Sequence, residues 1–186
     1  MTDPEHAPIE IVRLDAEEAA DAVTSLAELL VDSVDDGASV GFVWPFEADD
    51  AAAWWKAVFS DVRRGVVVLF AARAPERIVG TVQLRLAQYP NGRHRAEVAK
   101  LLVHTGARRQ GIARALMAAV EEEARRLGRS LLVPDTATDA AERLYASLGY
   151  STVGVVPGYA ADPDGTLRAT TIMWRRLVDA RELPLP

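Results

Sequence analysis

A short basic segment, residues 104–110, follows a run of apolar residues and precedes a helical pattern that starts at Gly111. Backbone amides in the first turn of a helix lack internal acceptors, and the aligned peptide dipoles add partial positive charge there. Phosphate groups therefore bind at such a turn without a special side chain. Small residues at Gly111 and Ala113 leave the backbone accessible, and Arg108 and Arg109 add positive charge. The segment is a candidate anion site, with a solvated helix cap as the alternative.

Several other chemistries are excluded by residue type or spacing. No Lys-Ser or Lys-Thr pair follows Gly111 and the G-x-G-x-x-G spacing does not occur there, which excludes a nucleoside-triphosphatase loop and a dehydrogenase loop. The chain has no cysteine, so disulfides, thiolate zinc sites and thiol nucleophiles are excluded. His104 and the basic cluster at 93–95 lack further ligands at metal-binding spacing. We expect no metal and interpret these residues as surface residues.

The net charge and the composition limit the classes of molecule that the protein is expected to bind. Of the 186 residues, 21 are Lys or Arg and 27 are Asp or Glu, so the net charge is −6 and nucleic acid is a disfavoured partner. A hydrophobic content of 49 % is typical of a globular protein, here a single domain over residues 1–186. Residues 1–8 carry no export pattern, and the longest apolar run, 66–72, is far shorter than the roughly 20 residues of a membrane helix. We expect a cytoplasmic protein with no membrane partner.

The elements that must position the basic segment follow from the periodicity of the apolar residues. Alternating or continuous apolar runs predict strands, and apolar positions three and four residues apart predict helices. Asp15 and Glu18 form a capping-box pattern at the start of the first helix. The predicted strands cover residues 9–14, 65–73, 78–88, 97–103, 130–133, 151–156 and 166–174, and the predicted helices cover 15–34, 49–62, 111–127 and 139–148. This order predicts a mixed central sheet with helices on both faces.

Two segments resemble a known enzyme family. Residues Arg108-Arg109-Gln110-Gly111-Ile112-Ala113 resemble the Arg/Gln-x-x-Gly-x-Gly/Ala signature of the GCN5-related N-acetyltransferases, the GNAT family. The downstream segment 144–150, Leu-Tyr-Ala-Ser-Leu-Gly-Tyr, is similar to the second hallmark of that family. The resemblance covers residues 65–177. The subgroup that includes tabtoxin-resistance acetyltransferases is similar at Asp135, Thr136, Ala141, Glu142, Leu144, Tyr145, Val153, Gly154 and Pro157.

This resemblance implies a fold, an acyl donor and a donor-binding segment. The fold is α/β, with a mixed, mostly antiparallel sheet that splays at its fourth and fifth strands, and the donor is acetyl-CoA. Residues 65–177 would form the acetyl-CoA-binding core, and residues 8–64 the acceptor side. The pantetheine arm would pair with the strand edge formed by Leu101, Leu102 and Val103. The pyrophosphate would rest on backbone amides in a segment that comprises Arg108, Arg109, Gln110, Gly111, Ile112, Ala113 and Arg114.

The resemblance also implies three candidate catalytic residues. Tyr145 matches a tyrosine that lies close to the thioester sulfur in many family members; a phenol with a pKa of about 10 can protonate the leaving thiolate. Glu97 matches a glutamate that serves some members as general base, and Asp135 could orient the amine or act as base. The alternatives are that Tyr145 packs its helix and that Glu97 is a solvated charge at a strand end. Asp135 lies one residue closer to Tyr145 than is usual in the subgroup.

The acceptor side is less defined by the sequence. Many relatives have asparagine where this chain has Thr138, so a ligand contact there is weakened or replaced. A group of aromatic residues either lines an acceptor pocket or packs in the core, and it consists of Trp44, Phe46, Trp54 and Trp55. The Asp-Pro-Asp-Gly tract at 162–165 is expected to be a turn, with a place at the border of the acceptor site as the alternative.

The sequence therefore predicts an N-acetyltransferase that transfers an acetyl group from acetyl-CoA to a primary amine of a small molecule, directly within a ternary complex. One alternative is a non-catalytic acyl-CoA-binding or regulatory module, because a fold does not establish an activity. Another is an N-acyltransferase that uses a different acyl-CoA. The oligomeric state stays open, with a homodimer among the alternatives.

Overall fold

The computed structural model describes residues 9–177, so the N-terminal segment 1–8 with its predicted lack of an export pattern lies outside the described residues. Seven strands form one sheet in the order β1-β2-β3-β4-β5-β7-β6. The pair β4–β5 is parallel and the other pairs are antiparallel, which confirms the predicted mixed, mostly antiparallel sheet. The elements are β1 Glu10–Leu14, α1 Ala16–Asp21, α2 Val23–Asp35, α3 Ala48–Arg63, β2 Val67–Arg73, β3 Ile78–Leu86, β4 Arg95–Val103, α4 Ile112–Arg126, β5 Leu131–Thr136, α5 Asp139–Ser147, β6 Ser151–Ala161 and β7 Leu167–Arg176.

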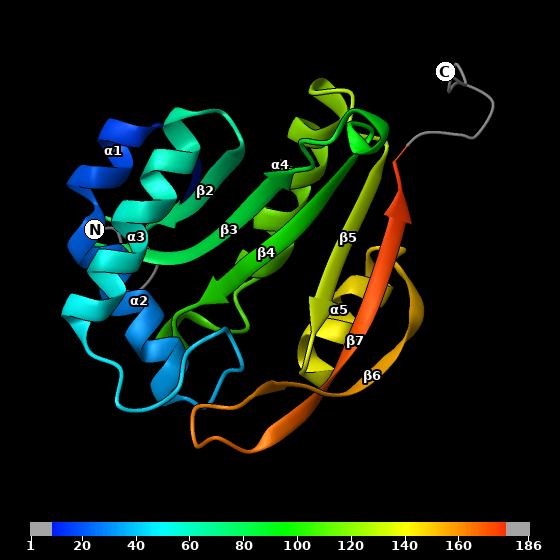
Figure 1. Ribbon diagram of the computed structural model, residues 1–186. Coiled ribbons are helices and arrows are strands. Elements are labelled where there is room, and N and C mark those ends of the chain that lie inside the picture. The colour runs from blue at the N-terminus through cyan, green and yellow to red at the C-terminus, as the bar shows by residue number, and fades with distance from the viewer. Residues whose placement is uncertain (1–8, 178–186) are drawn as a thin grey trace.

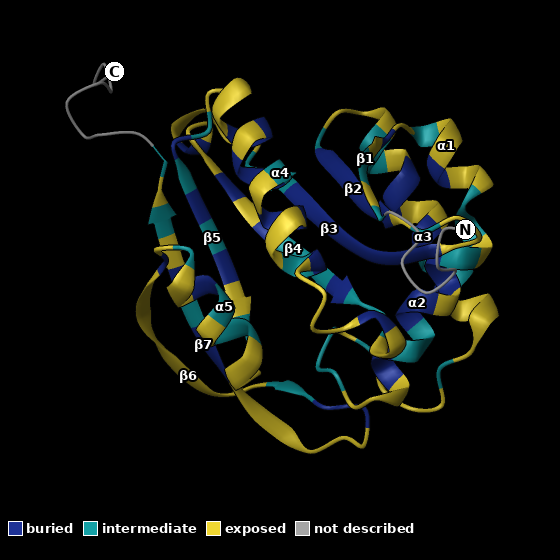
Figure 2. Cartoon of the chain, turned by 180° about the vertical axis from the view of Figure 1, so that it is seen from behind, coloured by how far each residue is buried: buried dark blue, intermediate teal, exposed yellow. Residues whose placement is uncertain are grey.

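Helices cover both faces of the sheet, as predicted. Helices α1, α2 and α3 lie over the first strands on one face, and α4 lies on the opposite face (Figure 1). Each face has its own hydrophobic cluster, centred on Leu26 and Trp55 beneath α1–α3 and on Leu116 and Leu132 beneath α4 and α5. Figure 2 shows that β3 is buried along most of its length, whereas β6 at the sheet edge is exposed. The face that carries α1–α3 is called the front face below.

The observed elements differ from the predicted ones in three places. The helix predicted over residues 15–34 is two helices that meet at Ala22, although the capping box of Asp15 and Glu18 is present as expected. Strand β5 extends to Thr136 instead of ending at residue 133, because Pro134 lies at the last β4–β5 pair, where its missing amide removes little pairing. Strand β6 extends to Ala161 through an irregular register.

Strands β4 and β5 part halfway along their length. Their parallel pairing runs from Arg95 opposite Leu131 to Val98 opposite Pro134 and then stops. Beyond that point β4 continues to Val103 beside β3, while β5 continues beside β7. The sheet is therefore splayed at its fourth and fifth strands in space, as the resemblance implies.

A β-bulge interrupts β4 where the two strands part. Gln83 of β3 pairs with Ala99 and Thr81 pairs with Leu102, so two residues of β4 lie opposite one residue of β3. The first of these, Lys100, has a left-handed backbone with φ of 51°. An extra residue changes the phase of the side-chain alternation. Val98 packs in the cluster under α4, and Leu102 packs in the cluster under α1–α3.

Candidate active site

The β4–α4 connection presents backbone amides to open space. Residues 105–107 form a short 3₁₀ turn, and α4 begins after Gly111, whose φ is 80°. Arg109 is also left-handed, with φ of 66°. Within the described residues, the backbone amides of 109–114 donate no hydrogen bond, and no side chain caps α4. A Cβ atom added at Gly111 would meet no atom within 4 Å, so the turn can admit an anion.

Helix α2 holds this connection in place. The carboxylate of Asp32 accepts hydrogen bonds from the Thr105 amide at 2.8 Å and from the Thr105 hydroxyl at 2.7 Å. His104, which the sequence analysis interprets as a surface residue, is half-buried, and its Nδ1 accepts the Gly106 amide at 3.1 Å. Its Nε2 lies 3.6 Å from Asp32. His104 therefore shapes the connection, and no spacing signal in the sequence connects it with Asp32, which is distant in the chain.

The arginines of the predicted donor segment have different surroundings. Arg108 forms an ion pair with Asp36 at 2.7 Å. Arg114 donates to the Ser147 hydroxyl at 2.7 Å and so connects α4 with α5. Arg109 is exposed and forms no ion pair within residues 9–177. The remaining predicted donor residues in this segment are Gln110, which is exposed, and Ile112 and Ala113, which open α4.

The strand edge predicted to bind pantetheine is the part of β4 beyond the splay. Leu102 and Val103 pair with β3 on one side, through Thr81 and Gly80. On the other side the pairing with β5 has already ended at Val98. Leu101, Leu102 and Val103 thus lie on a strand segment without a β5 partner, and an extended ligand could pair there.

Tyr145 projects from α5 and is 3 % exposed. Its ring lies 5.5 Å from the ring of Tyr150. Burial raises the pKa of the Tyr145 phenol above its usual range, and the negative charge of Asp135 raises the pKa further. The phenol therefore stays protonated at neutral pH and can donate a proton.

Glu97 and Asp135 lie on the same face of adjacent strands. Glu97 is opposite Val133 in the parallel β4–β5 pair, and Asp135 follows two residues later on β5. Both carboxylates are exposed, and neither forms an ion pair or a side-chain hydrogen bond in the part of the chain that the structure describes. The negative charge of Asp135 acts on the Tyr145 phenol, so the two groups lie within electrostatic range of each other. Glu97 is one strand away.

The predicted acceptor aromatics divide between core and site. Trp55 is fully buried and donates its indole N–H to the Leu26 carbonyl at 2.9 Å, so it belongs to the core. Trp54 is half-buried and meets Phe42 edge to face at 5.5 Å. Phe46 stacks on the same Phe42 ring at 4.3 Å. Trp44 is 48 % exposed. Trp54 is the member of this group that also reaches β4, because the Lys100 ammonium lies 5.5 Å from its ring centre.

The turn at 162–165 contacts the loop between α2 and α3. The Trp44 amide donates to the Pro163 carbonyl at 2.8 Å, and the Ser39 hydroxyl donates to the Ala161 carbonyl at 3.2 Å. Asp162 forms an ion pair with Arg168 of β7 at 2.5 Å. The predicted turn is therefore present, and it ties the β6–β7 hairpin to residues 36–47.

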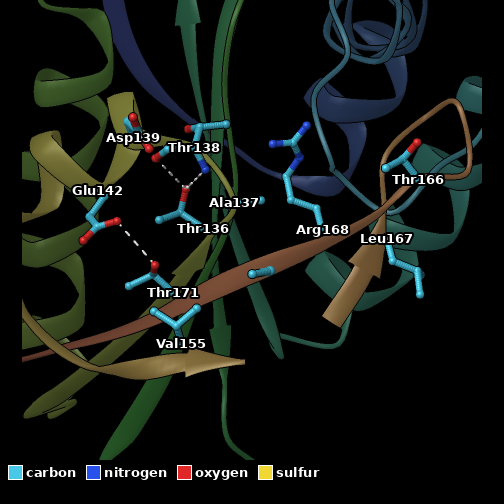
Figure 3. A pocket seen from close by; sticks show the side chains of 11 residues that line it. Thr136, Ala137, Thr138, Asp139, Glu142, Val155, Thr166, Leu167, Arg168 and Thr171 are labelled. Carbon is cyan, nitrogen blue, oxygen red and sulfur yellow. Dashed lines mark hydrogen bonds between the residues drawn. The ribbon is translucent and has the colours of Figure 1, made fainter. Parts of the chain in front are cut away.

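Two adjoining hollows lie beside this hairpin and do not include the catalytic candidates. The larger, of about 450 Å³, and the smaller, of about 390 Å³, share Ala137, Thr138, Asp139 and Arg168. Figure 3 shows Arg168 between the β5–α5 loop and the hairpin tip at Thr166, with Glu142 bonded to Thr171 on the opposite wall. Thr138 caps α5, since its hydroxyl accepts the Ala141 amide at 3.3 Å. These hollows border the end of β5.

Residues 9–177 contain neither a candidate membrane span nor a candidate metal site. Within residues 9–177, no helix combines the length and the apolar character needed to cross a membrane. Over the same residues, no three side chains of His, Cys, Asp or Glu gather where they could hold a metal ion.

Comparison with known proteins identifies a sequence family. The model of the Acetyltransferase (GNAT) family matches residues 24–150, which is more than half of the chain. The matched region includes the β4–α4 connection and Tyr145, the two places that carry the resemblance noted in the sequence.

Solved structures share the fold at low sequence identity. An N-acetyltransferase from Staphylococcus aureus Mu50 is 18 % identical with a TM-score of 0.76, over 92 % of this chain and 100 % of that chain. A GNAT superfamily phosphinothricin acetyltransferase from Sinorhizobium meliloti, in complex with acetyl-CoA, is 18 % identical with a TM-score of 0.75, over 95 % and 93 %. A ribosomal-protein-alanine N-acetyltransferase from Brucella melitensis is 21 % identical with a TM-score of 0.70, over 90 % and 99 %. The acceptors in these names differ, so the shared fold does not identify an acceptor.

Proposed function

The chain belongs to the GNAT acetyltransferase family, and we propose that it transfers the acetyl group of acetyl-CoA to a primary amine of a small molecule within a ternary complex. In this proposal the chain acts as a single domain, with residues 65–177 binding the donor and residues 8–64 contributing to the acceptor side. The cytoplasmic location and the homodimer stay predictions.

The observation that carries the proposal is the row of free backbone amides at 109–114. They begin a helix directly after the strand that loses its β5 partner, so a diphosphate and an extended arm can bind to consecutive parts of one segment. A related structure in complex with acetyl-CoA supports that donor. The open space above Gly111 fits the diphosphate, and Arg109 adds positive charge.

The side chains around the splay supply the remaining chemistry. The amine nitrogen attacks the thioester carbon, the C–N bond forms and the C–S bond breaks. Tyr145, which stays protonated, donates its proton to the leaving thiolate and regains one from solvent. Glu97 or Asp135 takes the proton that the amine loses. Backbone amides of β4 beyond residue 98 stabilise the developing oxyanion.

A small acceptor is supported by the contacts between the β6–β7 hairpin and residues 36–47. The contacts from Trp44 to Pro163 and from Ser39 to Ala161 tie the β6–β7 hairpin to residues 36–47. This connection borders the smaller hollow of about 390 Å³ through Ser39 and Asp162, a volume that suits a small acceptor. One alternative hypothesis is a module that binds acyl-CoA without turnover. The second alternative is an N-acyltransferase that uses a different acyl-CoA as donor.

The test is CoA release from acetyl-CoA with a panel of primary amines, with the product identified by mass spectrometry. We expect release above the hydrolysis background and a mass gain of one acetyl group on the amine. Binding of acetyl-CoA without turnover of any amine would instead support the binding module. Faster turnover with succinyl-CoA than with acetyl-CoA would support a different donor. Separate Glu97→Gln and Asp135→Asn variants identify the base, because loss of the base removes the acidic limb of the kcat/KM profile.

A further inference from the structure

On the front face, two cations, Arg85 and Lys100, accompany the two carboxylates that the sequence predicts as candidate catalytic groups. Arg85 of β3 lies directly opposite Glu97 of β4, and Glu97 lies opposite Val133 of β5. Since side chains two residues apart share a face of a strand, Asp135 belongs to the same face as Glu97. Three neighbouring strands therefore bring Arg85, Glu97 and Asp135 onto one surface.

The bulge brings a second cation to this surface. In a regular strand, Glu97 and Lys100 would point to opposite faces, because they are three residues apart. The extra residue at the bulge changes the phase, and the Lys100 ammonium lies 5.5 Å from the ring centre of Trp54 on the front face. It also lies 3.8 Å from the position of a Cβ atom at Gly41. Lys100 thus lies beneath the α2–α3 loop.

The two cations form no ion pair with the described part of the chain. Arg108, Arg168 and Arg175 form ion pairs of 2.7, 2.5 and 2.5 Å, whereas neither Lys100 nor Arg85 forms an ion pair in residues 9–177. Arg85 donates to the amide oxygen of Gln83 at 3.2 Å. Gln83 is fully buried, and its amide nitrogen has no acceptor within the same residues. Partly buried charges and polar groups without partners lower stability, and an anionic ligand would supply the missing partner.

The electrostatic coupling is consistent with this arrangement. Burial lowers the pKa of the Lys100 ammonium, and the positive charge of Arg85 lowers it further, while Asp135 and Glu97 act in the opposite direction. Lys100 therefore lies within electrostatic range of both carboxylates, and it forms no ion pair with them.

We propose that Lys100 and Arg85 bind a negatively charged group of the acceptor, so that the acceptor is an amine that also carries a carboxylate or a phosphate. This inference rests on the proposed function. Glu97 and Asp135 then face the amine end of the same molecule. Adjacent strands are about 4.8 Å apart, so β3 and β5 are separated by about 10 Å, a span that a small molecule with its two charges a few bonds apart can bridge. Gln83 positions Arg85 through its amide oxygen.

The experiment compares matched acceptors that differ only in the anionic group. CoA release is measured with L-methionine, L-phenylalanine and L-glutamine, with the amide of each, and with phosphoethanolamine against ethanolamine. We expect the members with an anion to have kcat/KM values about 10- to 100-fold higher than their neutral partners, as charge-assisted hydrogen bonds predict. The amino acids and phosphoethanolamine distinguish a carboxylate from a phosphate. Equal rates within each pair would overturn the inference while leaving the proposed function intact, whereas absence of turnover with every amine would contradict both.

Variants then test the residues. Lys100→Met removes the charge and keeps most of the length of an unbranched side chain. It should raise KM for the anionic acceptors about 10- to 100-fold while changing KM for the neutral ones less than about 3-fold. Lys100→Arg should restore much of the preference. The chain has one other lysine, Lys56 on the exposed side of α3, so Lys56→Met is the matched control. Arg85→Met provides a second, independent variant. An equal loss for both kinds of acceptor, with acetyl-CoA affinity unchanged by calorimetry, would overturn the assignment.

Discussion

The proposed donor segment and the proposed acceptor face offer different chemical groups to a ligand. The donor segment, residues 104–114, offers consecutive backbone amides, and one of its cations is already paired, Arg108 with Asp36. The proposed acceptor face, defined by Gln83, Arg85, Glu97, Lys100 and Asp135, offers side chains from three strands, and its charged side chains form no ion pair within residues 9–177. Most substitutions leave backbone groups unchanged, whereas a single substitution replaces a side chain. A donor site made of backbone amides should therefore tolerate substitutions better than an acceptor site made of side chains.

The largest expected effect on kcat is that of a substitution at Tyr145, the proposed general acid. Tyr145→Phe removes the phenol and should lower kcat about 10²- to 10⁴-fold, the usual range for a lost general acid. The affinity for acetyl-CoA should change less than about 2-fold, measured by calorimetry. The matched control is Tyr150→Phe, whose ring lies 5.5 Å away and whose phenol pKa is also raised, first by burial. Equal losses of kcat in the two variants would show that both tyrosines act through packing.

The next effect tests the backbone region. Gly111→Val adds a branched side chain in the open space at the start of α4 and should weaken acetyl-CoA binding about 10- to 100-fold, with little effect on acceptor preference. Gly128→Val is a matched control, because φ is 68° at Gly128 and 80° at Gly111, and both glycines have open space around the added Cβ. The two variants should lose similar thermal stability. Similar donor affinities in the two variants would refute the anion site at residues 109–114.

The smallest expected effect is a change in melting temperature, which should rise for a variant of the acceptor face and fall for a variant of the donor segment. Lys100→Met should raise the melting temperature at pH 7 by about 2 °C, and Arg108→Met should lower it by about 1 to 3 °C through loss of an exposed ion pair. Burial lowers the pKa of Lys100 below the ordinary lysine value of 10.5, so the unfolded chain binds its proton more tightly than the folded chain does. The penalty is complete below the folded pKa and disappears as the pH rises to 10.5 and above. Thermal denaturation of both variants and wild type between pH 7 and 10 measures it. A lower melting temperature for Lys100→Met at pH 7 would contradict the unpaired state of the cation.

The sequence predicts the donor segment better than the acceptor face, for a physical reason. Gly111 and its neighbours are contiguous, and the dipole and free amides of a helix start are local properties. The charges of the acceptor face come together only through strand register, and Lys100 stands in an apolar run that looks like an ordinary buried strand. The bulge has no local signal of glycine or proline. Likewise, the contact between Asp32 and Thr105 joins residues that no periodicity relates.

The lengths of β5 and β6 were underestimated for similar reasons. Pro134 favours an early strand end when it is considered alone, but the pairing of Asp135 with Ile172 of β7 continues β5 beyond it. In β6, Pro157 and Gly158 suggest a turn, while the pairing with β7 resumes at Ala160 opposite Arg168. In both strands, hydrogen bonds with a distant neighbour outweigh the local preference for a break.

The bulge in β4 places the side chain of residue 100 on the front face, where a positive charge can be accommodated, and the side chain of residue 101 on the opposite face. Position 101 packs toward the apolar cluster under α4, where an ammonium would be stranded in a hydrophobic interior. Removal of one residue near 100 would rephase the strand and turn Leu102 out of its own cluster. Natural variation in acceptor choice should therefore replace the residue at 100 and not shift it along the chain.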